Sequence, residues 1–150
     1  MKKMILMFLA VFAFAIVGNA QTTQKVKPTE ITKAEFLNKV ANYIKSPEEW
    51  KYLGDKPAII DFYASWCGPC RRVSPILDKL AEEYKGQIYI YKVNTDKEKE
   101  LSGELGIQSL PTLLFAPLKE KPQVAVGAMS EEDLRRAINE VLLQKETPKK

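Results

Sequence analysis

The sequence lacks histidine altogether and contains only two cysteines among its 150 residues. A cysteine protease needs a histidine base, and a mononuclear zinc site takes at least three protein ligands. Neither class of site can be built from this chain, and we expect no metal and no cofactor. The two cysteines, Cys67 and Cys70, would close so small a loop that their disulfide adds little stability, which disfavours a purely structural role.

Long apolar runs are also missing, except at the N-terminus. Lys2 and Lys3 precede an uninterrupted apolar run over residues 4–17, and Gly18-Asn19-Ala20 places small residues where a signal peptidase cleaves. The run is short for a membrane-spanning helix. We therefore predict a signal peptide over residues 1–20, cleavage after Ala20 and export to the periplasm. The alternative is an uncleaved anchor that holds the protein at the membrane, facing outside the cytosol.

Neither sign of charge dominates the chain. The formal net charge is +4, from 23 basic and 19 acidic residues, and such a mixed surface argues against nucleic acid as a partner. No internal repeat is visible. We expect one monomeric domain over residues 31–145, preceded by a polar, flexible leader at 21–30 and followed by a tail at 146–150.

Hydrophobic periodicity predicts alternating helices and strands. A first helix should begin after Thr32 and bury Phe36, Val40 and Ile44. Further helices are expected from Cys67 to Gly86, over 97–105 and after Ser130, and strands over 58–64, 87–93, 112–116 and 124–126. The alternation implies parallel crossovers, whereas the last two strands adjoin as a hairpin. The expected fold class is α/β, with a mixed central sheet flanked by helices on both faces.

Both cysteines fall at the junction between the strand over 58–64 and the following helix. The free N–H groups and the dipole at a helix start stabilise a thiolate. Cys67 should therefore ionise and attack first, and Cys70, one turn later and less exposed, should resolve the mixed disulfide. Pro69 suits the first helical turn, and Gly68 lets a substrate backbone approach closely. A pair of inert core cysteines is the alternative.

Asp61 interrupts the apolar run of the same strand. Aspartate is disfavoured in strands, and a buried carboxylate is costly unless it is paired. Either the strand ends early and Asp61 is exposed, or Asp61 is buried with a raised pKa and relays protons to Cys70. Lys92, on the next strand, is its expected partner.

Several segments together resemble the thioredoxin family over roughly residues 57–143. They are Ile60-Asp61-Phe62-Tyr63-Ala64-Ser65-Trp66-Cys67-Gly68-Pro69-Cys70, Lys92-Val93-Asn94-Thr95-Asp96, Leu110-Pro111-Thr112 and Val126-Gly127-Ala128. The resemblance implies the thioredoxin fold, a redox-active Cys67–Cys70 disulfide and a buried Asp61 with Lys92 beside it. It also implies a cis Leu110–Pro111 bond packed against the cysteines. The substrate groove would be lined by Trp66, Gly68, Pro69, Leu110, Pro111 and Gly127.

The residues between the cysteines bear on the direction of electron flow. Gly68-Pro69 matches the reducing members of the family, whereas oxidising relatives carry a histidine before the second cysteine. We therefore expect an exported reductase of protein disulfides with a potential near roughly −270 mV. Its electrons would come from a membrane thiol-transfer protein or a thioredoxin reductase. The alternatives are an exported disulfide oxidase or isomerase, a dedicated reductant for cytochrome c maturation, and a non-catalytic module that binds through the groove.

Overall fold

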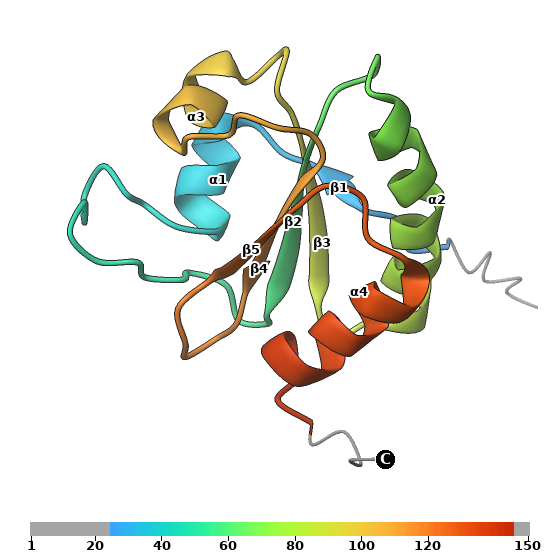
Figure 1. The fold of residues 1–150 in the computed structure, drawn as a ribbon. Coiled ribbons are helices and arrows are strands. Elements are labelled where there is room, and N and C mark those ends of the chain that lie inside the picture. Colours follow the sequence, from blue (N-terminus) through green and yellow to red (C-terminus); the bar gives the residue numbers. More distant parts are fainter. Residues whose placement is uncertain (1–24, 146–150) are drawn as a thin grey trace, which may run out of the picture.

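A five-stranded sheet with the order β1-β3-β2-β4-β5 forms the centre of the molecule in the computed structural model, which describes residues 25–145 (Figure 1). The strands are β1 (Thr29–Glu30), β2 (Ala58–Tyr63), β3 (Tyr89–Asn94), β4 (Thr112–Ala116) and β5 (Gln123–Val126). β1, β3 and β2 are parallel, and β4 and β5 are antiparallel to their neighbours. The predicted signal peptide over 1–20 and the tail over 146–150 lie outside the described residues.

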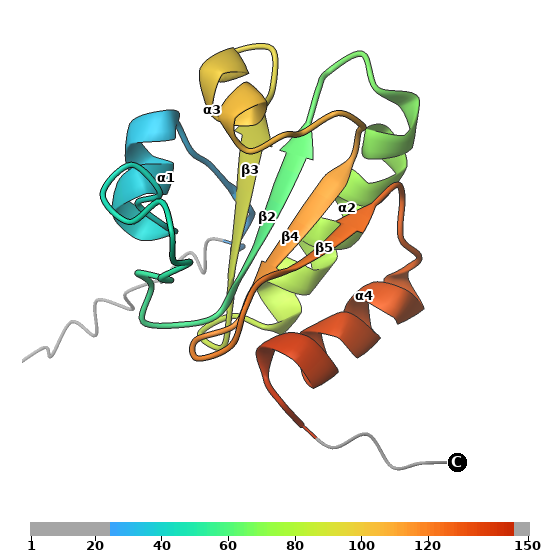
Figure 2. The ribbon, with the colours of Figure 1, turned by 60° about the vertical axis from the view of Figure 1, so that its left-hand side comes forward.

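Helices cover both faces of the sheet (Figures 1 and 2). α1 (Lys33–Lys39) and α3 (Lys99–Glu104) lie on one face, and α2 (Gly68–Glu83) and α4 (Glu131–Ala137) lie on the other. A π-helical turn, η1 (Ile138–Leu142), continues α4. The predicted fold class, a mixed sheet flanked by helices on both faces, is confirmed. Over residues 25–145, no helix has both the length and the apolar character that a membrane crossing requires.

Side chains of β2 alternate between two hydrophobic cores, as the strand period of two requires. Ala58, Ile60 and Phe62 pack with α1 and α3 residues, whereas Ile59 packs with residues of α2 and α4. Asp61 shares the parity of Ile59. The alternation therefore places its carboxyl on the face that α2 covers.

The first helix begins as predicted but ends early. Thr32 caps it: its Oγ1 accepts from Glu35 N–H at 3.3 Å, and Glu35 Oε2 accepts from Thr32 N–H at 3.0 Å. The expectation that Ile44 belongs to the buried stripe is wrong, because the helix stops at Lys39 and Ile44 is 59% exposed. Beyond Lys39 the backbone turns away to form a bridge between Ala41 and Tyr52.

The leader predicted over 21–30 is also corrected at its end. Thr29 and Glu30 form β1, which pairs in parallel with Tyr91 and Lys92 of β3. Upstream of this strand, Val26 N–H donates to Glu82 Oε2 on α2 at 2.5 Å. A strand of two residues is too short to show the alternation of apolar and polar residues that marks a strand in the sequence. Its place in the sheet is determined by pairing with β3 and not by a pattern of its own residues.

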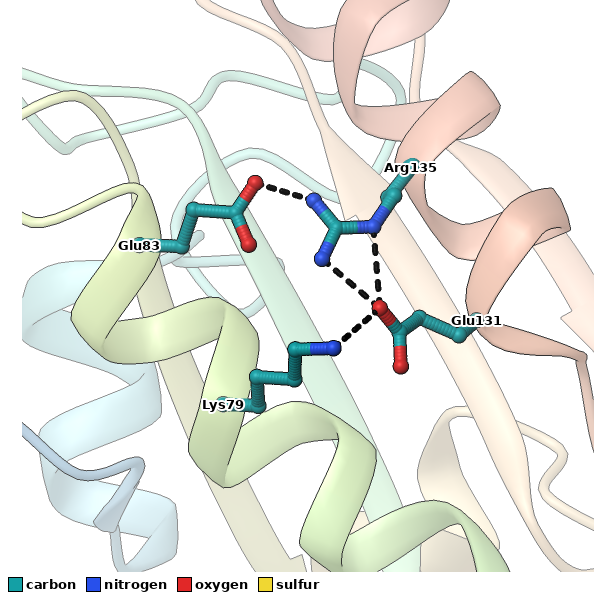
Figure 3. Close-up of polar contacts among 4 residues, drawn as sticks. All are labelled: Lys79, Glu83, Glu131 and Arg135. Carbon is teal, nitrogen blue, oxygen red and sulfur yellow. Dashed lines mark hydrogen bonds and ion pairs between the residues drawn. The ribbon is translucent and has the colours of Figure 1, made fainter.

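Ion pairs fasten α2 to α4 on the outer surface (Figure 3). Glu131 Oε1 accepts from Lys79 Nζ at 2.7 Å and from Arg135 Nη2 at 2.7 Å, and Arg135 also pairs with Glu83. The predicted cap of this last helix is present, because Ser130 Oγ accepts from Asp133 N–H at 3.1 Å. The helix that carries the cysteines is thus held from outside as well as by its core.

Candidate active site

Cys67 and Cys70 lie where β2 gives way to α2, as predicted. Cys67 is the N-cap of α2 and has an extended backbone, and its Sγ accepts from Cys70 N–H at 3.2 Å. The two residues form a disulfide, with 5.3 Å between their Cα atoms, a separation typical of disulfides. The N-cap position exposes Cys67 Sγ to the positive end of the helix dipole, which favours a thiolate when the bond is reduced.

The two cysteines differ in where they lie but not in their exposed fraction. Each residue is 4% exposed, so the expectation that Cys70 is the less exposed of the two is not met. Cys67, however, lines a surface hollow of about 440 Å³, and Cys70 is not among its lining residues. A substrate in this hollow would therefore meet Cys67 first.

The hollow is formed by the start of α2 and by the loops that follow β3 and α3. Its lining residues are Trp66, Cys67, Gly68, Pro69, Thr95, Ile107, Gln108 and Leu110. Four of the six predicted groove residues are among them. Gly68 presents open space to a substrate, since a Cβ added there would approach only the tip of Arg71, at 4.0 Å.

Pro111 and Gly127, the other two predicted groove residues, are not among the residues that line the hollow. The Leu110–Pro111 bond is cis, as the resemblance implied, and Leu110 packs against Cys67 and Cys70. Gly127 N–H donates to Pro111 O at 2.8 Å. This hydrogen bond ties the start of the β5–α4 loop to the cis proline. Gly127 has a φ of 96°, a backbone conformation that few other residues adopt.

Three lining residues were not predicted: Thr95, Ile107 and Gln108. Thr95 directly follows β3, and the carboxyl ends of the parallel strands β2 and β3 lie at the same edge of the sheet, so this position could have been found from the strand order. Asp96, the next residue, accepts from Trp66 Nε1 at 2.9 Å and holds the exposed indole over the hollow. Ile107 and Gln108 belong to an irregular loop, for which the sequence offered no signal.

Asp61 is buried, and the alternative of an early strand end with an exposed carboxyl is wrong. The residue is 1% exposed, and β2 continues to Tyr63 beyond it. Its Oδ1 has no hydrogen-bond partner among the described residues. Burial raises the pKa of Asp61 to about 6, although the charge of Lys92 acts in the opposite direction. A carboxyl with this pKa exchanges protons near neutral pH.

Lys92 lies beside Asp61 in the register of β2 and β3. Its ammonium donates to Ser74 Oγ on α2 at 2.9 Å and lies 4.3 Å from the centre of the Tyr63 ring. Sequence reasoning did not single out Ser74. The site thus combines a disulfide at a helix start, a surface hollow in front of it and a buried acid on the sheet face that α2 covers. This arrangement can carry out thiol–disulfide exchange.

Comparison with known proteins gives a consistent result. The family model for thioredoxin matches residues 27–140. Among curated relatives, a thioredoxin of Borreliella burgdorferi is 49% identical over 110 residues, covering 73% of this chain and 93% of the relative. A thioredoxin of Porphyra purpurea is 36% identical over 114 residues, covering 76% and 96%.

Solved structures show the same fold. Chloroplastic thioredoxin z aligns with a TM-score of 0.64 at 26% identity, covering 75% of this chain and 92% of that one. The thioredoxin of Malassezia sympodialis known as Mala s 13 aligns with a TM-score of 0.60 at 29% identity, covering 75% and 89%. The architecture described above is thus the thioredoxin fold.

Proposed function

The chain belongs to the thioredoxin family of thiol–disulfide oxidoreductases, and we propose that it is an exported reductase of protein disulfides. The observation that carries the proposal is the position of Cys67. It caps α2, borders the surface hollow and is bonded to Cys70 one turn away. Cys67 can therefore form a mixed disulfide with a substrate polypeptide, and the Cys67–Cys70 disulfide can form again afterwards.

The exchange proceeds in two steps. In the reduced protein, the Cys67 thiolate attacks one sulfur of a substrate disulfide, forms a mixed disulfide and releases the other substrate sulfur as a thiolate. The Cys70 thiolate then attacks Cys67 Sγ, which restores the Cys67–Cys70 disulfide and releases the second substrate thiol. The substrate gains two electrons, and an external dithiol donor must return them to the protein.

Asp61 is proposed to move the proton of Cys70. In the second step Cys70 must lose its proton to become a nucleophile, and a buried carboxyl whose pKa is about 6 can accept one at neutral pH. Asp61 and α2 share a face of the sheet, which places the acid beneath the helix that carries Cys70. Lys92, in register with Asp61, contributes the opposing charge.

The hollow favours an extended, partly apolar polypeptide as substrate. Trp66 is 68% exposed, and Ile107 and Leu110 line the same surface, so apolar side chains beside the substrate cystine can be buried there. Gly68 leaves room for backbone to approach Cys67. We assign Pro111 and Gly127 to the support of this surface, because Gly127 N–H binds Pro111 O.

Export is supported by the N-terminal pattern of two lysines, an apolar run and small residues at the expected cleavage point. The family match begins at residue 27, after that point. Expression of the full chain in a bacterium with a periplasm should give a mature protein that starts at Gln21, measured by mass spectrometry of the periplasmic fraction. Intact protein in the cytosol would contradict export, and intact protein in the membrane would indicate an anchor.

Reductase activity is tested by the reduction of insulin disulfides with dithiothreitol as the electron source. We expect Cys67→Ser to abolish turnover, and Cys70→Ser to accumulate a mixed disulfide with the substrate. Lys85→Ser is the matched control, because it introduces a serine at an exposed position in the turn that follows α2. If Cys67→Ser retained full activity while remaining folded, the site assignment would be wrong.

The direction of electron flow is tested by equilibration with glutathione buffers. We expect a potential near roughly −270 mV, which is typical of reducing members of the family. A value near that of a strong oxidant, roughly −120 mV, would overturn the proposed reductase and favour an exported oxidase.

A further inference from the structure

Lys92 and Asp61 are neighbours whose side chains are held in different ways. Adjacent strands lie about 4.8 Å apart, and the two residues face each other across β2 and β3, so a lysine side chain can reach the carboxyl. The Lys92 ammonium instead donates to Ser74 Oγ at 2.9 Å. Asp61 Oδ1, buried, has no hydrogen-bond partner among the described residues.

Ser74 lies one turn after Cys70 on α2, and its hydroxyl meets Lys92 from the helix side of the sheet. An ammonium group has three donors and no acceptor, and leaving a donor unsatisfied in a partly buried place is costly. Without the Ser74 hydroxyl, the ammonium would lose this acceptor. Two carboxyls are in register with Lys92, that of Glu30 on β1 and that of Asp61 on β2. Glu30 already accepts from the Tyr63 hydroxyl and from Lys97, so Asp61 is the acceptor that the ammonium can gain.

The other groups around the pair do not compete for this role. From β4, Asp61 faces Leu113, which is apolar. Glu30 on β1, whose charge also acts on Lys92, is bound to the Tyr63 hydroxyl and to Lys97. On α2, Arg71 and Arg72 are exposed. Lys92 is thus the charged neighbour that acts on the Asp61 carboxyl.

We infer that Ser74 is a positioning residue of the redox site: its hydroxyl holds the Lys92 ammonium away from Asp61 and so determines how much of that carboxyl is protonated at neutral pH. The inference rests on the proposed function only in giving Asp61 the task of moving the Cys70 proton. Both forms of the acid must be present for it to give and accept a proton in the same pH range. An ammonium bound directly to the carboxylate would favour the ionised form alone.

The test is a direct titration of Asp61 in the oxidised full chain by carboxyl carbon NMR. The disulfide-bonded cysteines do not titrate in that state, so no thiol titration complicates the result. Ser74→Ala should lower the midpoint of Asp61 by about 1 pH unit, since an opposite charge at close range favours the ionised form by that order. Ser74→Thr, which keeps a hydroxyl, should leave the midpoint unchanged.

A second background separates positioning from packing. In Lys92→Met, the ammonium is absent, so adding Ser74→Ala should no longer move the Asp61 midpoint. The inference is overturned if Ser74→Ala leaves the midpoint unchanged or raises it, or if the shift persists in the Lys92→Met background. A folded Ser74→Thr control in the same spectra shows whether any failure comes from loss of structure.

Insulin reduction by the same variants shows whether the proton of Asp61 serves exchange. In Ser74→Ala, the pH profile should move to lower pH by the amount that NMR records for Asp61. If the midpoint moves but the profile does not, the positioning of Lys92 stands and the proton-relay role of Asp61 fails. If the wild-type protein reduces no insulin, the proposed function fails, and the NMR result still decides the role of Ser74.

Discussion

Charged side chains lie on both sides of α2. Those on the outer side have partners of opposite charge, whereas the carboxyl on the inner side lacks a full set of hydrogen bonds. On the outer surface, Lys79 and Glu83 pair with Glu131 and Arg135 of α4, and every partner remains accessible to water (Figure 3). On the inner side, Asp61 is 1% exposed, and one of its carboxyl oxygens has no hydrogen bond within residues 25–145.

The difference separates what holds the fold together from what the site requires. Exposed ion pairs gain little, because water and salt screen them and ordering long side chains costs entropy. An ionised carboxylate that is buried without full pairing costs several times more. The free energy that α2 and α4 gain from their surface pairs is thus smaller than the free energy that the fold loses at Asp61. Substitutions on the two sides of α2 test this contrast.

Asp61→Asn should produce the largest change, a gain in stability that depends on pH. The pKa of Asp61 is raised by burial from an ordinary 3.8 to about 6, so the folded state disfavours the ionised form. The contribution of Asp61 to the stability of the wild-type protein is fully present below about pH 4, and about 3 kcal/mol of it is lost as the pH rises through 6. The neutral amide cannot ionise, so the variant should gain that amount relative to wild type between about pH 3 and pH 8. Urea unfolding of both oxidised proteins measures it.

The control for this measurement is Glu48→Gln, which neutralises an exposed carboxyl in the loop after α1. The difference in unfolding free energy between Glu48→Gln and the wild-type protein should not change by a comparable amount over the same pH range. Other groups titrate at low pH in all three proteins, and their contribution cancels in the differences. A pH-independent difference for Asp61→Asn would mean that the carboxyl ionises as freely in the folded state as in the unfolded state.

Lys92→Met should have the next largest effect. The charge of Lys92 lowers the pKa of Asp61 and partly offsets the effect of burial, so its removal should raise the pKa above about 6, by about 1 pH unit. The loss of stability with rising pH still begins near pH 4, where the unfolded chain ionises, but it continues to a higher pH and becomes larger. Carboxyl NMR measures the midpoint. The matched control is Lys97→Met, which removes an exposed lysine that pairs with Glu30. Equal midpoints in the two variants would show that Lys92 does not act on Asp61.

The sequence was informative about the inner side of α2. A single aspartate inside an apolar strand, followed at the next strand by a single lysine, is a local pattern that predicts a pair, and the register of β2 and β3 places both on one face. The same holds for Cys67, because a strand followed by Gly-Pro and a helical stripe marks a helix start. These predictions depend on residues close in sequence or on regular periods, which a single chain displays directly.

Other contacts could not be predicted, because they depend on where separate elements meet. A serine on a helix is compatible with exposure to solvent, so Ser74 gave no sign that it would bind Lys92. Ile107 and Gln108 line the hollow from a loop without a period, and Glu131 meets Lys79 across 52 positions of sequence. The early end of α1 has the same origin, since the bridge from Ala41 to Tyr52 is a tertiary contact.

On the outer side, Arg135→Gln should have a small effect that depends on salt. Arg135 bonds both Glu83 and Glu131 but its side chain remains 29% exposed, so the variant should lose less than about 1 kcal/mol of unfolding free energy at low ionic strength. Added salt should reduce the difference further. Arg136→Gln is the control, because Arg136 pairs within α4 with Asp133. A loss of several kcal/mol that salt did not change would remove the contrast with Asp61.

Lys79→Met should have the smallest effect. Lys79 is 59% exposed in its side chain and contributes a single contact, to Glu131. When it is removed, Arg135 of α4 still pairs with Glu83 of α2, so the link between the two helices persists. We expect urea unfolding to show no difference from wild type beyond experimental error, and insulin reduction to be unchanged. A measurable loss in Lys79→Met that vanished when Arg135 was also replaced would show that the surface pairs act as one cooperative unit. In that case water and salt would screen these charges only weakly. The comparison with Asp61 would then have to include this screening as well as the exposure of the charges.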